Sequence, residues 1–293
     1  MNFIDPMLLD SCKEPFNSEN HIFEPKSNGI RLELLRSESQ TKLITRHGTD
    51  VTKSLPELLK LDLSAGTILD GELVCYSPHN PLEEDFEAVM SRIVSKSEKS
   101  VKQQMSINPC NYIVFDILMY RNKPLMDLPL VARKQILESK VSNQSYLQKV
   151  MYLRKNGNQL FEVIKKHKLE GIVAKRIESR YHAGKRPVDV WTKIINWRYS
   201  DCLISGFRKE QTGWYLEVIG GEGIGSKGFV EFGISKEMKQ LFYEITKKMV
   251  VKEDKKSVWI QKILKCEVKH RGVLKSGNLM TPVFVKFLID EIK

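Results

Sequence analysis

The residues with the clearest chemical potential lie in one short stretch, Glu24-Pro25-Lys26-Ser27-Asn28-Gly29-Ile30-Arg31. A lysine amine attacks an electrophile such as a phosphate only when it is partly deprotonated, and neighbouring cations or a bound metal lower its pKa. A lone Lys-x-x-Gly carries little information, because a solvated lysine at a strand edge has the same appearance. Lys26 is therefore a candidate nucleophile only if other parts of the chain support it.

Four further segments place charged or aromatic side chains beside short apolar runs: Leu69-Asp70-Gly71-Glu72-Leu73-Val74, Val114-Phe115-Asp116-Ile117-Leu118, Glu170-Gly171-Ile172-Val173-Ala174-Lys175 and Trp191-Thr192-Lys193. Each segment is weak alone, but five segments in this order are hard to obtain by chance. The set resembles the ATP-dependent DNA ligases of the covalent nucleotidyltransferase superfamily, especially the minimal bacterial and prophage-encoded members. The resemblance extends from about Pro6 to Phe284.

The resemblance implies a reaction that seals nicks in double-stranded DNA in three steps. Lys26 would attack ATP to form a covalent lysyl-AMP, AMP would pass to the 5′-phosphate of the nick, and the 3′-hydroxyl would expel it. Mg²⁺ or Mn²⁺ would be required, and the protein would act as a monomer. The implied metal-binding carboxylates are Glu170 and Glu72, since a metal that bridges phosphate oxygens neutralises charge in the transition state.

The resemblance also implies a set of side chains around the nucleotide, namely Glu24, Arg31, Arg46, Glu72, Phe115, Ile172, Lys175 and Lys193. Glu24 would read the adenine amino group. Phe115 would stack on adenine, with Ile172 or Val173 packing on the opposite side of the base.

The remaining implied contacts are to the sugar and the phosphates. Arg31 and Arg46 would contact the ribose and the phosphates, and Glu72 would hold a ribose hydroxyl or a metal-bound water. Lys193 would grip the α-phosphate, and Lys175 is a weaker candidate for the same wall of the site.

Three positions depart from the pattern of this family. Asn28 replaces an aspartate, Ile195 replaces a second lysine, and Met280 stands where related ligases often have arginine. Asn keeps the shape of Asp but loses its charge. We therefore expect Asn28→Asp to raise the sealing rate, unless the rest of the site has adapted to the neutral residue.

The composition favours a polyanionic partner. The 293 residues carry 47 Lys and Arg against 36 Asp and Glu, a formal net charge of +11. Such an excess attracts nucleic acid. The five cysteines are scattered without Cys-x-x-Cys spacing, which argues against a disulfide framework or a zinc site. We see no signal peptide and no run of transmembrane length, so we expect a cytoplasmic protein without a membrane partner.

The pattern of elements predicts an α+β nucleotidyltransferase (adenylation) domain at 1–200 and a small β-barrel OB-fold domain at 201–293. Strands are expected at 67–76, 111–120 and 171–175, and helices at 85–93, 130–141 and 158–168. After residue 200 short strands and one amphipathic helix, expected at 236–250, fit an OB-fold. The glycine-rich stretch 220–228 lacks the spacing of a phosphate loop and is expected to connect two strands.

Two alternatives remain open from the residues alone. One is an RNA ligase or an mRNA-capping guanylyltransferase, which would share the lysine motif. The other is a weakly active, nick-binding relic of a ligase, motivated by Asn28, Ile195 and Met280. Formation of a labelled covalent adduct, and the nucleotide that supports it, separates these possibilities.

Overall fold

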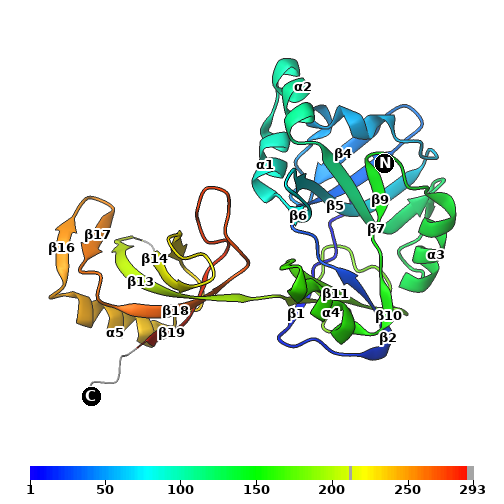
Figure 1. Ribbon diagram of the computed structural model, residues 1–293. Helices are drawn as coiled ribbons and strands as arrows, with labels where there is room; N and C mark the ends of the chain where they lie inside the picture. The colour runs from blue at the N-terminus through cyan, green and yellow to red at the C-terminus, as the bar shows by residue number, and fades with distance from the viewer. Residues whose placement is uncertain (211–212, 289–293) are drawn as a thin grey trace. The chain divides into compact units, whose positions relative to one another are not determined.

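The computed structural model describes residues 1–210 and 213–288 and divides the chain into two compact units, Met1–Asn196 and Trp197–Lys293 (Figure 1). The first unit combines two sheets with helices, and the second consists mostly of strands with one helix. Within the described residues, no helix is long and apolar enough to cross a membrane. The coarse expectation of an α+β part followed by a β-rich part is confirmed.

The first sheet of the first unit contains the strand that ends just before Lys26. Its order is β1 (Asp10–Cys12), β12 (Trp191–Ile195), β11 (Gly171–Arg176), β2 (Ser18–Pro25) and β10 (Leu153–Lys155). Helix α4 (Gly157–Lys166) packs on one face through an apolar cluster. Residues far apart in sequence therefore lie on adjacent strands.

The second sheet provides the other wall of the first unit. Its order is β4 (Thr41–Thr45), β3 (Ile30–Arg36), β5 (Thr67–Ser77), β7 (Cys110–Tyr120) and β8 (Lys123–Pro124), with β6 (Asn80–Glu84) on β5 and β9 (Leu147–Lys149) on β7. The apolar runs of β5 and β7 fill the largest core cluster. The predicted strands 67–76 and 111–120 are thus confirmed.

The first two helices of the chain begin where a side chain caps their first turn. Helix α1 (Phe86–Val94) starts after Asp85, whose Oδ1 accepts from the Ala88 N–H at 3.0 Å. Helix α2 (Glu98–Ile107) starts after Ser97, and α3 (Leu130–Lys140) after Pro129; two 3₁₀ turns, η1 (Thr52–Ser54) and η2 (Pro56–Lys60), precede β5. The helices expected at 85–93, 130–141 and 158–168 are confirmed, whereas α2 had not been expected.

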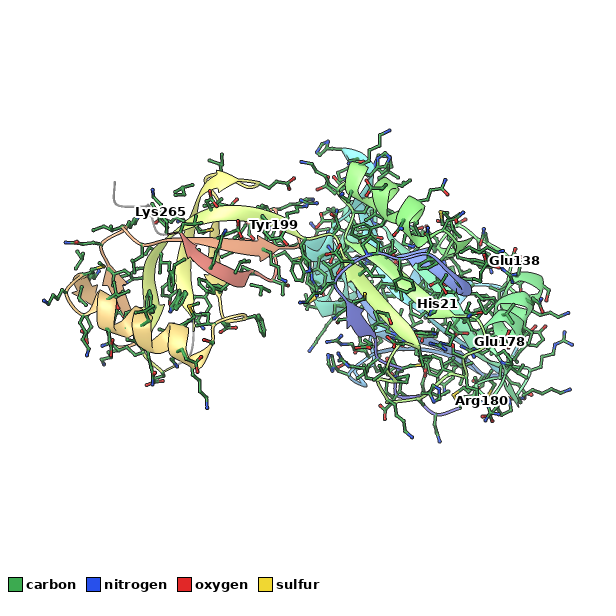
Figure 2. The ribbon with its side chains drawn as sticks, turned by 90° about the horizontal axis from the view of Figure 1, so that it is seen from below. His21, Glu138, Glu178, Arg180, Tyr199 and Lys265 are labelled. Carbon is green, nitrogen blue, oxygen red and sulfur yellow. The ribbon has the colours of Figure 1, made fainter. Side chains whose placement is uncertain are left out.

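The second unit is a curled sheet around an aromatic core. Its order is β15 (Lys227–Val230), β14 (Trp214–Gly221), β13 (Arg198–Arg208), β17 (Ser257–Ile260) and β16 (Val250–Glu253), and β18 (Lys265–His270) joins β13 to β19 (Val283–Leu288). Figure 2 labels Tyr199 and Lys265 on the paired strands β13 and β18. In the core, Trp214 stacks on Phe242 of α5 (Lys236–Thr246) with ring centroids 4.4 Å apart.

Two expectations for this unit have different outcomes. The helix expected at 236–250 is four residues too long, because α5 ends at Thr246. Val250 instead belongs to β16, where it pairs with Ile260 of β17. The glycine-rich stretch does connect two strands, since β14 and β15 pair antiparallel on either side of it. Gly223 and Gly225 turn the chain there with positive φ angles, which glycine adopts without strain.

The junction between the units is short and anchored on its first side. Only Asn196 and Trp197 separate β12 from β13. The Asn196 backbone N–H donates to the Glu170 carbonyl oxygen (2.9 Å), and its side-chain Nδ2 donates to the Leu169 carbonyl oxygen (3.0 Å). Asn196 is thus bound to the segment that precedes β11.

Candidate active site

Lys26 directly follows β2, and its amine contacts a buried carboxylate. Because β2 and β11 are antiparallel, with Pro25 opposite Ile172, Lys26 lies level with the start of β11. Its backbone N–H donates to the Gly171 carbonyl oxygen (2.9 Å), and its Nζ lies 2.9 Å from Glu170 Oε2. The Lys26 side chain is 17% exposed and that of Glu170 is 4% exposed. The structure therefore brings the expected nucleophile and an expected metal-binding carboxylate together.

Two further carboxylates act electrostatically on this pair. Glu72 lies on β5 opposite Arg31 of β3, and Glu84 ends β6. Burial raises the pKa of Glu72 to about 7; Lys26 and Arg31 oppose this shift, and Glu170 and Glu84 add to it. Glu72 is therefore poised to accept a cation, because a positive charge would relieve the repulsion among the carboxylates.

Glu84 is a site residue that the sequence analysis missed. Its carboxylate accepts a hydrogen bond from the backbone N–H of Asn28 and one from the Ser27 hydroxyl. Burial raises the pKa of Glu84, and these two donors oppose the shift. In the sequence Glu84 is one of several neighbouring acidic residues before a helix, and only the pairing of β5 with β6 carries it to Lys26.

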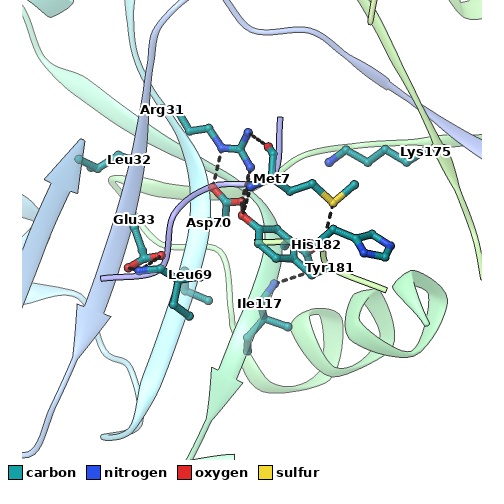
Figure 3. A network of polar contacts seen from close by, with 12 residues as sticks. Met7, Arg31, Leu32, Glu33, Leu69, Asp70, Ile117, Lys175, Tyr181 and His182 are labelled. Atoms are coloured by element: carbon teal, nitrogen blue, oxygen red, sulfur yellow. Dashed lines mark hydrogen bonds and ion pairs between the residues drawn. The ribbon is translucent and has the colours of Figure 1, made fainter. Parts of the chain in front are cut away.

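Arg31 is held by a dense polar network (Figure 3). Its guanidinium donates to both carboxylate oxygens of Asp70, at 2.9 and 2.6 Å, to the Met7 carbonyl oxygen at 2.6 Å and to the Tyr181 hydroxyl at 3.2 Å. Tyr181 in turn donates to Asp70 at 2.7 Å. Asp70 raises the pKa of Arg31 against the opposing effect of burial. Arg31 thus ties the N-terminal segment to the sheet, and its expected contact with the nucleotide stays a prediction.

Glu24 is enclosed by two lysines. Lys175 Nζ lies 2.7 Å from Glu24 Oε2, and Lys134 of α3 forms an ion pair with the other carboxylate oxygen. All three side chains are at least nine-tenths buried. Burial lowers the pKa of Lys175 to about 8 although Glu24 opposes the shift. Glu24 is therefore a buried hydrogen-bond acceptor that two lysines hold in place. Lys134 was not expected from the sequence.

Phe115 belongs to an aromatic wall next to this cluster. Its ring meets that of Trp191 edge to face, with centroids 6.1 Å apart. Lys175 Nζ lies 4.2 Å from the Phe115 centroid and 4.0 Å from the Trp191 centroid, so both rings contact the cation. The structure brings Phe115, Lys175 and Glu24 together, and their expected roles around the nucleotide stay predictions.

The strands β2, β11 and β12 have two faces of opposite character. On the helix-side face, Phe23, Ile172, Ala174 and Ile194 pack against α4. On the site face, Val173 is paired with Glu24 on one neighbour and with Lys193 on the other. Paired residues point to the same side and successive residues alternate. Ile172 therefore faces α4, and Val173 lies on the same side as Glu24 and Lys193; the expected contact of either residue with adenine stays a prediction.

The remaining candidates lie in different surroundings. Lys193 is on the site face, and Ile195 is buried on the same strand opposite Gly171. Arg46 is exposed in the turn after β4, where its Nε donates to His47 Nε2 at 2.9 Å. Met280 belongs to the second unit. The structure thus places Lys193 on the site face, and Arg46 contacts His47 in an exposed turn.

The carboxylates suit a metal that arrives with phosphates. Among residues 1–210 and 213–288, no three His, Cys, Asp or Glu side chains form a ready cage for a metal ion. Mg²⁺ commonly binds one or two carboxylates and completes its shell with water and substrate phosphates. Glu170 and Glu72 fit this mode, since both face Lys26 and repel each other.

Comparison with known proteins matches residues 6–194 to the model of the ATP dependent DNA ligase domain. The SPbeta prophage-derived DNA ligase-like protein LigB of Bacillus subtilis is 40% identical over 283 residues, which is 96% of this chain and 98% of that protein. DNA ligase C1 of Mycolicibacterium smegmatis is 28% identical over 76% of this chain, which spans 63% of that protein's length.

Solved structures share the fold at low sequence identity. A Lig E DNA ligase superposes with a TM-score of 0.67 at 15% identity, covering 98% of this chain and all of that one. A mycobacterial DNA ligase D complexed with ATP and MES gives 0.58 at 23% identity, covering 98% and 96%. The chain therefore belongs to the ATP-dependent DNA ligases, enzymes that seal nicks in DNA through a covalent lysyl-AMP intermediate.

Proposed function

We propose that this protein seals nicked double-stranded DNA with Lys26 as the residue that carries AMP. The observation that supports this role is the 2.9 Å contact between Lys26 Nζ and Glu170, with the Glu72 carboxylate also acting on the amine. We propose that Glu170 and Glu72 hold Mg²⁺ or Mn²⁺, which would neutralise charge on the phosphate oxygens.

In the first step Lys26 loses a proton and attacks the α-phosphate of ATP. A nitrogen–phosphorus bond forms, and the bond to pyrophosphate breaks. The ion pair with Glu170 holds the Lys26 amine next to a carboxylate that would bind the metal. Lys193, on the site face, binds the α-phosphate in this proposal and stabilises its developing charge.

The adenine lies between Phe115 and Val173, with Glu24 accepting from its amino group. Phe115 supplies an aromatic surface already close to Lys175 and Glu24, and Val173 supplies an apolar contact on the strand next to Glu24. Glu24 forms ion pairs with Lys134 and Lys175, and a carboxylate accepts a hydrogen bond more strongly than a neutral acid does. Arg31 and Arg46 complete the contacts to the ribose and phosphates.

In the second step an oxygen of the nick's 5′-phosphate attacks the phosphorus of lysyl-AMP, and Lys26 leaves as an amine that takes up a proton. In the third step the 3′-hydroxyl attacks the activated 5′-phosphate, loses its proton and expels AMP. The chemistry of these two steps takes place on phosphates, so the same cationic and metal-binding groups serve all three steps.

We propose that the first unit is the adenylation domain and that the second is an OB-fold barrel that binds DNA as part of a monomer in the cytoplasm. Closure of the barrel is supported by parallel bridges from the β15 region to residues near β19, Lys227 to Asn278 and Phe232 to Val283. Residues 201–293 hold 17 Lys and Arg against 12 acidic residues, a +5 excess that favours a polyanion.

The deciding experiment is incubation with ATP labelled at its α-phosphate, together with Mg²⁺ or Mn²⁺, followed by denaturing electrophoresis. We expect the wild-type protein to become labelled and Lys26→Ala to remain unlabelled. Lys26→Ala should still seal a pre-adenylated nick, because that step does not use the lysine as a nucleophile.

Each other outcome has a clear meaning. Label on Lys26→Ala would show that another residue carries AMP. A wild-type protein that binds a nick but takes no label would favour the nick-binding relic, which Asn28, Ile195 and Met280 motivate. Labelling by GTP in place of ATP would favour the capping reaction.

A further inference from the structure

Glu84 stands beside the nucleophile without a place in the family's motif series. It ends β6, and its carboxylate accepts from the Asn28 backbone N–H and the Ser27 hydroxyl, in the loop that follows Lys26. Lys26 stabilises the charged form of Glu84, and Glu170 opposes it. Glu84 therefore belongs to the same electrostatic group as Lys26 and Glu170.

The position of Glu84 is fixed from both sides. Glu84 is paired with Tyr76 across the β5–β6 hairpin. The next residue, Asp85, donates its N–H to the Cys75 carbonyl oxygen at 2.8 Å and caps helix α1 through Ala88. A carboxylate between a strand pair and a helix cap has little freedom to leave.

The loop after Lys26 is also fixed in position, because it packs closely against β5. A side-chain carbon on Gly29 would lie 2.1 Å from the Leu73 carbonyl oxygen, so the loop runs directly against the β5 backbone. Gly29 is needed for this approach. The contact between Asn28 and Glu84 thus joins two segments that are each fixed independently.

Asn28 is neutral where the family has an aspartate, and Glu84 places a negative charge on the backbone of that same residue. We propose that Glu84 is a positioning residue for Lys26: it anchors the Ser27–Gly29 loop and supplies the negative charge that Asn28 lacks. The inference rests on the proposed role of Lys26 and extends it to a residue outside the family motifs.

The proposal changes the expectation for Asn28→Asp. With Glu84 already present, an aspartate at this position adds a second carboxylate at the same loop, and like charges repel. We therefore expect Asn28→Asp alone to be slower than the wild type, and the same change to restore a protein that has lost the charge of Glu84.

The test compares five proteins: wild type, Glu84→Gln, Asn28→Asp, the Glu84→Gln/Asn28→Asp double variant, and Glu83→Gln. Glu83 is the exposed neighbour on β6 and serves as the matched control. Gln keeps the hydrogen-bond acceptor and removes the charge, so the comparison isolates charge from loop anchoring. Thermal unfolding confirms that every variant is folded.

The first readout is the single-turnover rate of Lys26 adenylation and of sealing a pre-adenylated nick. We expect Glu84→Gln to slow the sealing of a pre-adenylated nick, a step in which Lys26 is not the nucleophile, by about 10²-fold, the effect of losing one preorganised charged contact. The double variant should lie within about threefold of the wild type by the same reasoning, because it regains one carboxylate. Glu83→Gln should match the wild type.

The second readout needs neither ATP nor metal. Competitive acetylation of Lys26 at a series of pH values, followed by peptide mass spectrometry, reports the pKa of its amine. Removing a nearby negative charge destabilises the ammonium form, so Glu84→Gln should move the acetylation profile to lower pH and the double variant should move it back. A residue that only holds the loop would leave this profile unchanged.

Two results would overturn the proposal. One is a Glu84→Gln protein with wild-type rates and a wild-type acetylation profile. The other is a double variant whose defect is the product of the two single defects, since charge replacement requires rescue. A wild-type protein that takes no label from ATP would instead overturn the proposed function, and the metal-free acetylation profile would still report on Glu84.

Discussion

The same three strands of the first unit build both a hydrophobic core and a charged site. Phe23, Ile172, Ala174 and Ile194 cover α4 on the helix-side face, whereas the alternate residues of β2, β11 and β12 present Glu24, Val173, Lys175 and Lys193 on the site face. Because side chains alternate along a strand, moving the register by one residue would exchange the two faces. The position of the site is therefore fixed by the packing of α4 behind it.

The two faces also differ in what stabilises them. Apolar side chains on the helix-side face are stabilised by burial itself. Buried charges on the site face lose hydration, and only close opposite charges offset that loss. Glu24 has Lys134 and Lys175 as partners, and Glu170 has Lys26. The charged face thus depends on specific pairs, while the apolar face depends on filled volume.

The largest expected effect is on the adenylation rate, which should depend on the site face and not on the helix-side face. Lys193→Ala should reduce the rate of Lys26 adenylation by about 10²–10³-fold, because a preorganised cation at the phosphate is lost. Thr192→Val, one residue earlier on the helix-side face, keeps its shape and should leave the rate near that of the wild type. Single-turnover labelling with ATP measures both. Equal rates for Lys193→Ala and wild type would remove Lys193 from the reaction.

The free energy of unfolding should depend more on the helix-side face than on the site face. Ile172 is fully buried against α4, so Ile172→Ala should lower the free energy of unfolding by about 2–5 kcal/mol with little change in ATP affinity. Val173→Ala removes less volume and should mainly weaken ATP binding. Urea denaturation and ATP titration of the two variants give the comparison. An Ile172→Ala protein of normal stability and weak ATP binding would restore the original assignment of Ile172.

The smallest expected effect is a change of stability with pH that is caused by Glu72. Glu72 has a folded-state pKa of about 7 against an ordinary value of 4.5, so its contribution to stability is complete below pH 4.5 and is lost as pH rises through 7. The wild type should therefore lose stability relative to Glu72→Gln over this window, by at most about 1.4 kcal/mol per pH unit. Urea denaturation of both ligand-free proteins provides the test. A constant difference across this window would mean that Glu72 is not shifted.

The sequence predicted elements whose patterns are local. Short apolar runs gave β5 and β7, and the helical spacing of apolar residues in 85–93 gave α1. Lys26 and Glu170 were both candidate site residues because each lies in a motif segment, but their contact appears only in the structure. The strands, the helix and the motif segments need only composition, period and order along the chain.

Features that depend on neighbouring strands were missed. Ile172 and Val173 are both apolar, so nothing in β11 itself shows which one faces α4. The helix expected to reach Val250 stops at Thr246 because Val250 pairs with Ile260, and pairing overrides helical periodicity. Lys134 and Glu84 reach the site only through the folding of α3 and the β5–β6 hairpin. The sequence thus identifies candidate site residues, but the pairing of strands determines which of them come into contact.

The anchored junction has a mechanical consequence. Asn196 is fastened to the backbone of Leu169 and Glu170 by two hydrogen bonds. Asn196 could not be displaced without breaking both bonds, and both are made to the segment that carries the carboxylate partner of Lys26. The two bonds therefore lock the end of β12, which carries Lys193, to the backbone beside Glu170.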